Sequence, residues 1–218
     1  MNRFFKNNGL SLVFFFLFFL TFFGQVVFGL KEHNKDLAEM GQESQSIPAY
    51  LSSGHFLQST FENWESEFLQ MALLVLLTIV LQQKGSSESK DFDKEEEVDR
   101  EPDPTRKNAP WPVKKGGWVL AVYKHSLTIV LGLLFIVSLL FHFYGSLADE
   151  NQQLAAKGES LEQPLEYLGD SRFWFESMQN WQSEFLSVFA IIVLSIYLRQ
   201  KGSPQSKPVD APHRETGE

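Results

Sequence analysis

Two glutamates, Glu67 and Glu184, are the ionisable side chains in this sequence that are best placed to bind a proton or a cation. Each lies three residues after a tryptophan, within Asn63–Leu69 and Asn180–Leu186 respectively, at the start of a short apolar run. Because that run is too short to cross a bilayer without its first turn, we expect each carboxylate at the boundary of the hydrocarbon. Acidic groups at that depth are costly and usually face the interior of a helix bundle.

A site of this kind needs polar partners from neighbouring helices. Gln25 and His142 fall near the outer ends of the two longer apolar runs, at matching positions. We therefore predict a polar cluster formed by Glu67, Glu184, Gln25 and His142. Intramembrane ionisable groups often mark proton or ion pathways, so the cluster is a candidate proton or cation site.

The same residues also have a structural interpretation. Polar side chains hold transmembrane helices together through hydrogen bonds worth about 0.6–2 kcal/mol each. The glutamates can equally cap a neighbouring helix or bind interfacial water. Polar residues become fewer along the predicted helices towards their cytoplasmic ends, and no charged residue there continues a path for protons. The sequence leaves both interpretations open.

Enzymatic chemistry has little support in the sequence. There is no cysteine, which excludes disulfides, thiolate metal sites and a cysteine nucleophile. No glycine-rich phosphate loop, serine-hydrolase elbow or zinc-protease motif is present. The five histidines are scattered without metal-ligand spacing. We predict that the chain is not an enzyme and uses no cofactor or metal. The central loop mixes both charges, so we expect no nucleic-acid partner.

The elements that position the candidate residues are apolar segments of bilayer-spanning length. We predict four spanning helices, at about residues 10–30, 64–82, 120–147 and 181–199. Trp64 and Trp181, with Asn63 and Asn180, are predicted to anchor two of them at the outer interface. The aromatic residues just before them predict short amphipathic helices that lie in that interface.

The chain contains an internal repeat. Trp64 and Trp181 are 117 residues apart, and the same register holds from Leu10/Leu127 to Lys90/Lys207. The predicted parts are a first hairpin (1–90), a charged, proline-containing linker (91–115), a second hairpin (116–207) and a tail (208–218). We expect the linker and the tail to be disordered, because neither can bury an apolar core. We expect the first apolar run to be retained, since its equivalent lies in mid-chain.

The distribution of lysine and arginine predicts the orientation. The first hairpin loop, residues 31–66, contains only Lys31 and Lys35, and the second, residues 148–183, only Lys157 and Arg172. The linker and both ends are much richer in basic residues. The positive-inside rule therefore places both termini and the linker in the cytoplasm. The predicted fold class is an all-α integral membrane protein of two tandem hairpins.

Two further stretches accompany the duplicated motif N-W-x-S-E-F-L and the sequence x-Q-K-G-S that follows each copy. They are Ala109–Val113 and Gly116–Leu120, before the third apolar segment. With these residues the chain resembles a bacterial family of small four-helix integral membrane proteins that is known only as a domain of unknown function. The resemblance implies a multi-pass protein of the bacterial inner membrane with no assigned activity. It transfers no catalytic or binding residue.

These observations support two functional hypotheses. The first is a structural or accessory membrane protein that binds partners, because the repeated residues concentrate at the interfaces. Its expected partners are the lipid bilayer and either a second copy of the chain or another membrane protein. The alternative is a small proton- or cation-coupled transporter or channel subunit that uses Glu67 and Glu184.

Overall fold

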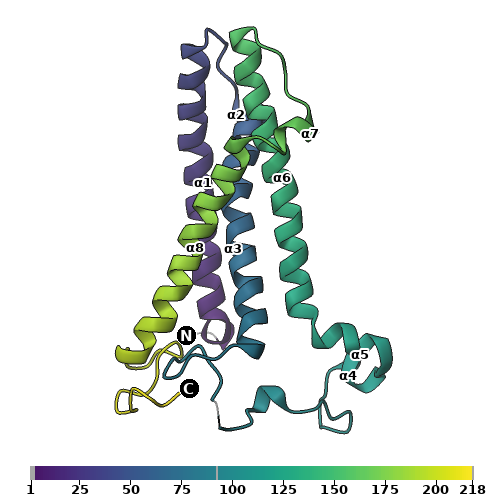
Figure 1. The fold of residues 1–218 in the computed structure, drawn as a ribbon, viewed down its shortest axis with the longest axis vertical. Helices are drawn as coiled ribbons and strands as arrows, with labels where there is room; N and C mark the ends of the chain where they lie inside the picture. Colours follow the sequence, from purple (N-terminus) through teal and green to yellow (C-terminus); the bar gives the residue numbers. More distant parts are fainter. Residues whose placement is uncertain (1–2, 92, 218) are drawn as a thin grey trace. The chain divides into compact units, whose positions relative to one another are not determined.

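The computed structural model describes residues 3–91 and 93–217, and every regular element in these ranges is a helix. Four helices are long and apolar enough to cross a membrane: α1 (Arg3–Glu39), α3 (Gly54–Val80), α6 (Ser126–Lys157) and α8 (Ser171–Tyr197). The shorter ones in Figure 1 are α2 (Ile47–Tyr50), the 3₁₀ helix η1 (Glu97–Asp99), α4 (Trp111–Lys115), α5 (Gly117–Lys124) and α7 (Pro164–Tyr167). The prediction of an all-α chain with four candidate spanning helices is confirmed.

The helix boundaries differ from the predicted ones. The helices α3 and α8 each begin ten residues before their tryptophans, Trp64 and Trp181. The aromatic stretches that predicted separate interfacial helices are therefore the first turns of these long helices. No proline or internal glycine interrupts either sequence, so the backbone hydrogen bonds continue without a break.

The third predicted helix is divided in two. The helix α5 ends before His125, whose φ of −115° and ψ of 10° lie outside the helical range, and α6 begins at the next residue. At the other end, α6 continues to Lys157, well beyond the predicted limit at residue 147. Similarly, α1 contains 37 residues. That corresponds to about 55 Å of helix, against about 30 Å of hydrocarbon. Both helices thus carry polar turns beyond their apolar parts.

The chain folds as two compact units. The first comprises Met1–Phe61 and Leu140–Phe173, and the second comprises Glu62–Leu139 and Trp174–Glu218. The helices α1, α2 and α7 belong to the first unit, and α4 and α5 to the second. The long helices α3, α6 and α8 contribute turns to both.

In the first unit, two asparagines each hold the loop that follows their helix. The amide of Asn34 donates to the carbonyl of Gln45 at 3.1 Å, and its oxygen accepts from the Gln45 N–H at 2.7 Å. Asn151 makes the same two bonds with Glu162, also at 3.1 and 2.7 Å. Each side chain satisfies both backbone groups of one loop residue, which fixes where the chain turns back.

Two tyrosines form the centre of the first unit, and both are fully buried. The hydroxyls of Tyr167 and Ser146 are hydrogen-bonded at 2.5 Å. The Tyr50 hydroxyl lies 3.3 Å from His55 Nδ1. Its approach to α1 requires a glycine, because a Cβ at Gly29 would lie 2.2 Å from that hydroxyl. One buried tyrosine thereby holds each of the short helices α2 and α7 in place.

The helices α3 and α6 approach so closely in the first unit that their backbones touch. A Cβ added to Gly54 would lie 2.4 Å from the backbone nitrogen of Asp149 and 2.7 Å from the carbonyl oxygen of Gly145. A Cβ added to Gly145 would lie 2.5 Å from the backbone nitrogen of Gln58. Small residues allow this kind of close approach between membrane helices.

In the second unit, the segments that follow α3 and α8 fold through matching bonds. The N–H of Gln83 donates to Ser89 Oγ at 2.9 Å, and that of Gln200 donates to Ser206 Oγ at 2.9 Å. Both donors and both acceptors are 117 residues apart. The two segments therefore share a local structure as well as a sequence.

The glycines in these segments have a left-handed conformation. Gly85 has a φ of +86° and Gly202 a φ of +85°. The helices α3 and α8 end before the predicted limits, at Val80 and Tyr197, so these glycines lie beyond the helices. The glycines thus form turns in the following segments.

The predicted linker and tail make specific contacts in the second unit. Lys90 pairs with Asp99 at 2.8 Å. Lys207 is almost fully buried, and its ammonium donates to three carbonyl oxygens, of Pro212, His213 and Glu215. Burial lowers the pKa of this ammonium. The disorder of residues 91–115 and 208–218 remains a prediction.

Candidate functional site

Glu67 and Glu184 both belong to the second unit. Glu67 on α3 is exposed, and Glu184 on α8 is half-buried. The structure therefore places both predicted carboxylates in one unit and gives them different exposure.

Gln25 and His142 belong to the first unit. The side-chain amide of Gln25 donates to Thr60 Oγ1 at 3.0 Å, which links α1 to α3. His142 on α6 is fully buried, and its ring lies 5.1 Å from that of Phe173. Both residues thus make contacts within the first unit.

The predicted anchor Trp181 has a specific partner in the second unit. Its indole N–H donates to the carboxylate of Glu65 at 3.0 Å. Its ring also packs edge-on against Phe135, with 6.3 Å between centroids. The other predicted tryptophan, Trp64, is half-buried. Trp181 therefore connects α8 to α3 by a hydrogen bond, and it is also a candidate anchor.

The predicted anchors Asn63 and Asn180 have matching local bonds. Ser66 Oγ donates to the Asn63 carbonyl and Ser183 Oγ to the Asn180 carbonyl, both at 2.8 Å. The Asn180 side chain donates to the carbonyl of Glu176 at 3.0 Å. These bonds stay within one helix, so they stabilise the helix locally.

The carboxylate that the sequence reasoning missed is Glu65. It is fully buried, whereas Glu67 is exposed. Two residues along a helix correspond to a rotation of about 200°, so the two side chains point in nearly opposite directions. The second half has Gln182 at the position equivalent to Glu65. The two copies therefore differ at this position, and that difference is the sequence signal that points to Glu65 as a candidate residue.

A second pair of carboxylates lies in the same unit. One oxygen of Glu62 on α3 and one of Glu176 on α8 lie within 4.8 Å of each other, and both residues are half-buried. Two carboxylates this close can share a proton or attract a cation.

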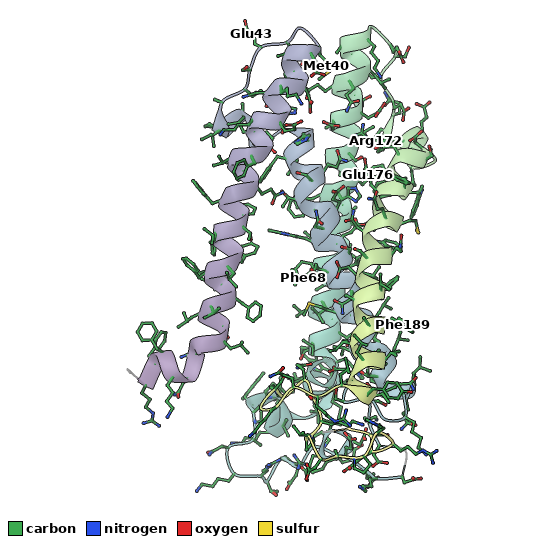
Figure 2. All side chains as sticks on the ribbon, turned by 90° about the vertical axis from the view of Figure 1, so that its left-hand side faces the viewer. Met40, Glu43, Phe68, Arg172, Glu176 and Phe189 are labelled. Carbon is green, nitrogen blue, oxygen red and sulfur yellow. The ribbon has the colours of Figure 1, made fainter. Side chains whose placement is uncertain are left out.

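Arg172 organises the charged end of the first unit, near the start of α8 (Figure 2). Its guanidinium donates to Asp149 at 2.6 Å, to Glu150, and to the side chain of Gln58 at 3.2 Å. Its backbone N–H donates to Asp170 at 2.6 Å. One cation thus joins α8 to α6 and α3, and it compensates two carboxylates that are mostly buried.

In the first half of the chain, two histidines occupy the positions that correspond to Glu150 and Arg172 in the second half. They are His33 and His55, 117 residues earlier in the sequence. Their rings are stacked, with 4.9 Å between centroids. His33 is almost fully buried, and its Nε2 has no hydrogen-bond partner among the described residues. The two halves therefore join the same helical positions by different interactions.

These features define the class of protein. It is an all-helical chain with four helices compatible with membrane crossing and with polar clusters that join the helices. Over its whole length, residues 1–218, the chain matches the family described as Domain of unknown function (DUF6766), and it belongs to that family. The resemblance to a family of unknown function is thereby confirmed. No curated protein and no solved structure matches the chain.

Proposed function

We propose that the chain is a multi-pass protein of the bacterial inner membrane, built from two tandem hairpins with both termini in the cytoplasm. The lysine and arginine distribution supports this orientation. The side chains along residues 13–20 of α1 are exposed and apolar, as they would be in lipid. The bonds that recur at a spacing of 117 residues, such as those of Asn34 and Asn151, support a duplicated hairpin.

The proposed molecular role is that of an accessory protein that binds a membrane partner through its outer loops. The observation that carries it is the orientation of α7. Tyr167 is fully buried, while Leu165 beside it is 83% exposed and Leu168 is 46% exposed. A short helix that is fixed by a buried tyrosine and presents leucines outwards is typical of a preformed contact surface. In the other loop, Ile47 and Leu51 of the α2 region are also exposed.

Partners follow from this role. They are the lipid bilayer, together with a second copy of this chain or another membrane protein. The proposal includes no enzymatic activity, no cofactor and no nucleic-acid partner. Loop segments held by buried tyrosines and by the Arg172 network lose little conformational entropy on binding, which favours affinity.

The experiment is to measure the size of the complex in mild detergent after extraction from native membranes. We expect a species larger than the monomer in detergent, and we expect Leu165→Ser/Leu168→Ser to shift it to the monomer. The matched control is Leu133→Ser/Leu134→Ser on α6, which are also exposed leucines and should leave the size unchanged. A loop variant that keeps the wild-type size, or a control that dissociates it equally, would contradict the proposal.

The second candidate function is proton or cation transport, and a specific observation favours it. The second unit holds the carboxylates of Glu62 and Glu176 within 4.8 Å of each other, together with the fully buried Glu65. Acidic groups inside a membrane protein commonly belong to ion or proton pathways. Glu67 and Glu184 are two further carboxylates in the same unit.

Ion flux in proteoliposomes under imposed proton and potassium gradients tests this candidate. We would compare the wild type with Glu62→Gln/Glu176→Gln and with Glu67→Gln/Glu184→Gln. A flux that one double variant abolishes while the other retains it would identify the working pair. If the wild type and both variants conduct no ion, the transport function is wrong for these ions.

A further inference from the structure

A basic segment without acidic residues precedes α6 in the second unit. Residues 106–125 contain four lysines, one arginine and no aspartate or glutamate, although the whole chain has a net charge of −8. Lys124 pairs with Glu101 at 3.2 Å. The other lysines, which we call the unpaired lysines, are exposed and form no ion pair with any residue that the structure describes: Lys107, Lys114 and Lys115.

Large aromatic side chains are exposed beside these lysines. Trp111 is 66% exposed and Trp118 is 78% exposed. In α4, Trp111 lies three and four residues before Lys114 and Lys115, so one face of the helix carries the ring and both charges. In α5, Trp118 and Val122 are four residues apart and form an exposed apolar face. Lysine combined with tryptophan is typical of a segment that lies in a membrane interface.

Two glycines and a histidine set the positions of α4 and α5. Gly116 and Gly117 have φ of +68° and +59°, a conformation that favours glycine, and the helices on either side of them are in contact. His125 ends α5, and α6 begins at the next residue. Figure 1 shows α5 turned away from the axis of α6 at this junction. The two short helices are thus attached to the start of an apolar helix without continuing it.

The position and the charge of the segment favour a membrane surface as its partner. If α6 crosses the bilayer from its start at Ser126, the helices before it lie at the level of the lipid headgroups. Anionic lipids attract lysine there, by about fivefold in affinity for each residue near the surface. The exposed tryptophans directly before an apolar helix favour lipid over an acidic protein, because tryptophan is enriched at membrane interfaces.

We propose that α4 and α5 lie on the cytoplasmic surface of the membrane and bind anionic phospholipid headgroups through Lys107, Lys114 and Lys115. The proposal rests on the proposed membrane location and deepens it, since it names the class of lipid and the residues that bind it. The site is on the side of the membrane opposite the outer loops, so it is independent of the partner surface proposed there.

The test uses the full chain in proteoliposomes, and a fluorophore is attached to one introduced cysteine because the chain has none of its own. Ala121→Cys places the label at an exposed position of α5, and Leu17→Cys places it in the apolar part of α1. The bilayer contains equal parts of phosphatidylglycerol and phosphatidylcholine, and one of the two is brominated in each sample to quench nearby labels. We expect phosphatidylglycerol to be favoured beside the α5 label by at least about fivefold, the effect of one lysine.

Two triple variants test which charges are responsible. Replacing all three unpaired lysines by glutamine should abolish the preference for phosphatidylglycerol at the α5 label. The matched control is Lys84→Gln/Lys94→Gln/Lys201→Gln, which removes three exposed lysines from elsewhere in the same unit and should keep the preference. A preference that survives the first variant, or that both variants abolish equally, would overturn the proposal.

The label in α1 separates this proposal from the membrane location on which it rests. Both brominated lipids should quench the Leu17 label about equally, because it reports contact with the bilayer core. If they quench that label and leave the Ala121 label unquenched, the basic segment does not contact the bilayer. The proposal is then overturned in favour of an acidic soluble partner, while the membrane location stands. If neither label is quenched, the membrane location is wrong and this proposal fails with it.

Discussion

Gly54 on α3 and Gly145 on α6 are in direct backbone contact, since a Cβ on Gly54 would lie 2.7 Å from the carbonyl oxygen of Gly145. No side chain larger than hydrogen fits at this crossing without moving a helix. The two helices belong to different halves of the repeat, so this contact fixes one half against the other within the first unit.

This contact predicts a strong effect of a single methyl group. Gly54→Ala should lower the free energy of unfolding by about 1–3 kcal/mol, because it overpacks a backbone contact. Gly132→Ala on α6 is the matched control, since a Cβ there meets nothing within 4 Å. Improved helix propensity should make it neutral or slightly stabilising. Thermal unfolding in detergent measures both, and equal behaviour of the two variants would contradict the close crossing.

The Arg172 network predicts a charge-specific loss. Arg172→Gln leaves Asp149, whose side chain is 8% exposed, without its cation. We expect a loss of about 2–3 kcal/mol, less than for a fully buried pair because Arg172 is partly exposed. The double variant Arg172→Gln/Asp149→Asn should recover part of this loss. Lys35→Gln, which breaks an exposed pair with Glu32, should leave stability almost unchanged, because water and salt screen an exposed ion pair.

The asparagine clamps predict equal effects in the two loops. Asn34→Ala and Asn151→Ala each remove two hydrogen bonds of the same length. We expect each to cost about 1–3 kcal/mol and to speed hydrogen exchange at the amide of Gln45 or Glu162 respectively. Exchange that accelerates at the other loop, or at neither, would show that the clamps do not hold these turns.

We predict that the stability of the folded protein depends on pH through Glu162, whereas Gln45 at the matching position of the first loop cannot titrate. Burial raises the pKa of its carboxyl, and the nearby charges of Asp170, Glu150 and Glu166 raise it further. The folded state therefore favours the protonated form, and stability is lost as the pH rises from the unfolded value, 4.5, through the folded one. Glu162→Gln, which reproduces Gln45 of the first loop, should stabilise the protein at pH 7.

The measurement is the difference in melting temperature between Glu162→Gln and the wild type across pH. We expect it to be positive at pH 7 and to vanish towards pH 4, where the wild-type carboxyl is protonated. Because the side chain is half-exposed, the difference should be small. A difference that is independent of pH would assign the effect to packing.

The hydrogen bond between Trp181 and Glu65 predicts a further loss. Trp181→Phe removes one hydrogen-bond donor from a fully buried carboxylate, which should cost about 1–3 kcal/mol. Trp118→Phe, at a position that is 78% exposed, controls for the loss of an indole. Combining Trp181→Phe with Glu65→Gln should restore part of the stability. A double variant no better than Trp181→Phe would show that the charge of Glu65 is not the cause.

The sequence predicted the existence of four long apolar helices because their apolar runs are long, but it did not predict their boundaries. We placed the start of α3 at Trp64 because the apolar run from Phe68 needs an extra turn to span a bilayer, whereas the helix follows backbone hydrogen bonding and begins at Gly54. The repeat singled out Glu67 and Glu184 as candidates, and it could not tell whether the two carboxylates lie in contact. The burial of Glu65 did not, because repeat-based reasoning weights positions that agree, and here Glu65 faces Gln182 in the alignment of the halves.

The histidine pair and the arginine network occupy the same positions in the two halves, and they respond to different solution conditions. Arg172 and Glu150 form an ion pair whose attraction added salt weakens only in part, because both side chains are mostly buried, whereas the stacked rings of His33 and His55 form no ion pair with each other. We therefore expect high ionic strength to weaken the contact of Arg172 with Glu150 more than the contact of His33 with His55. Two loops at matching positions in the sequence thus differ in how salt affects the contacts beside them.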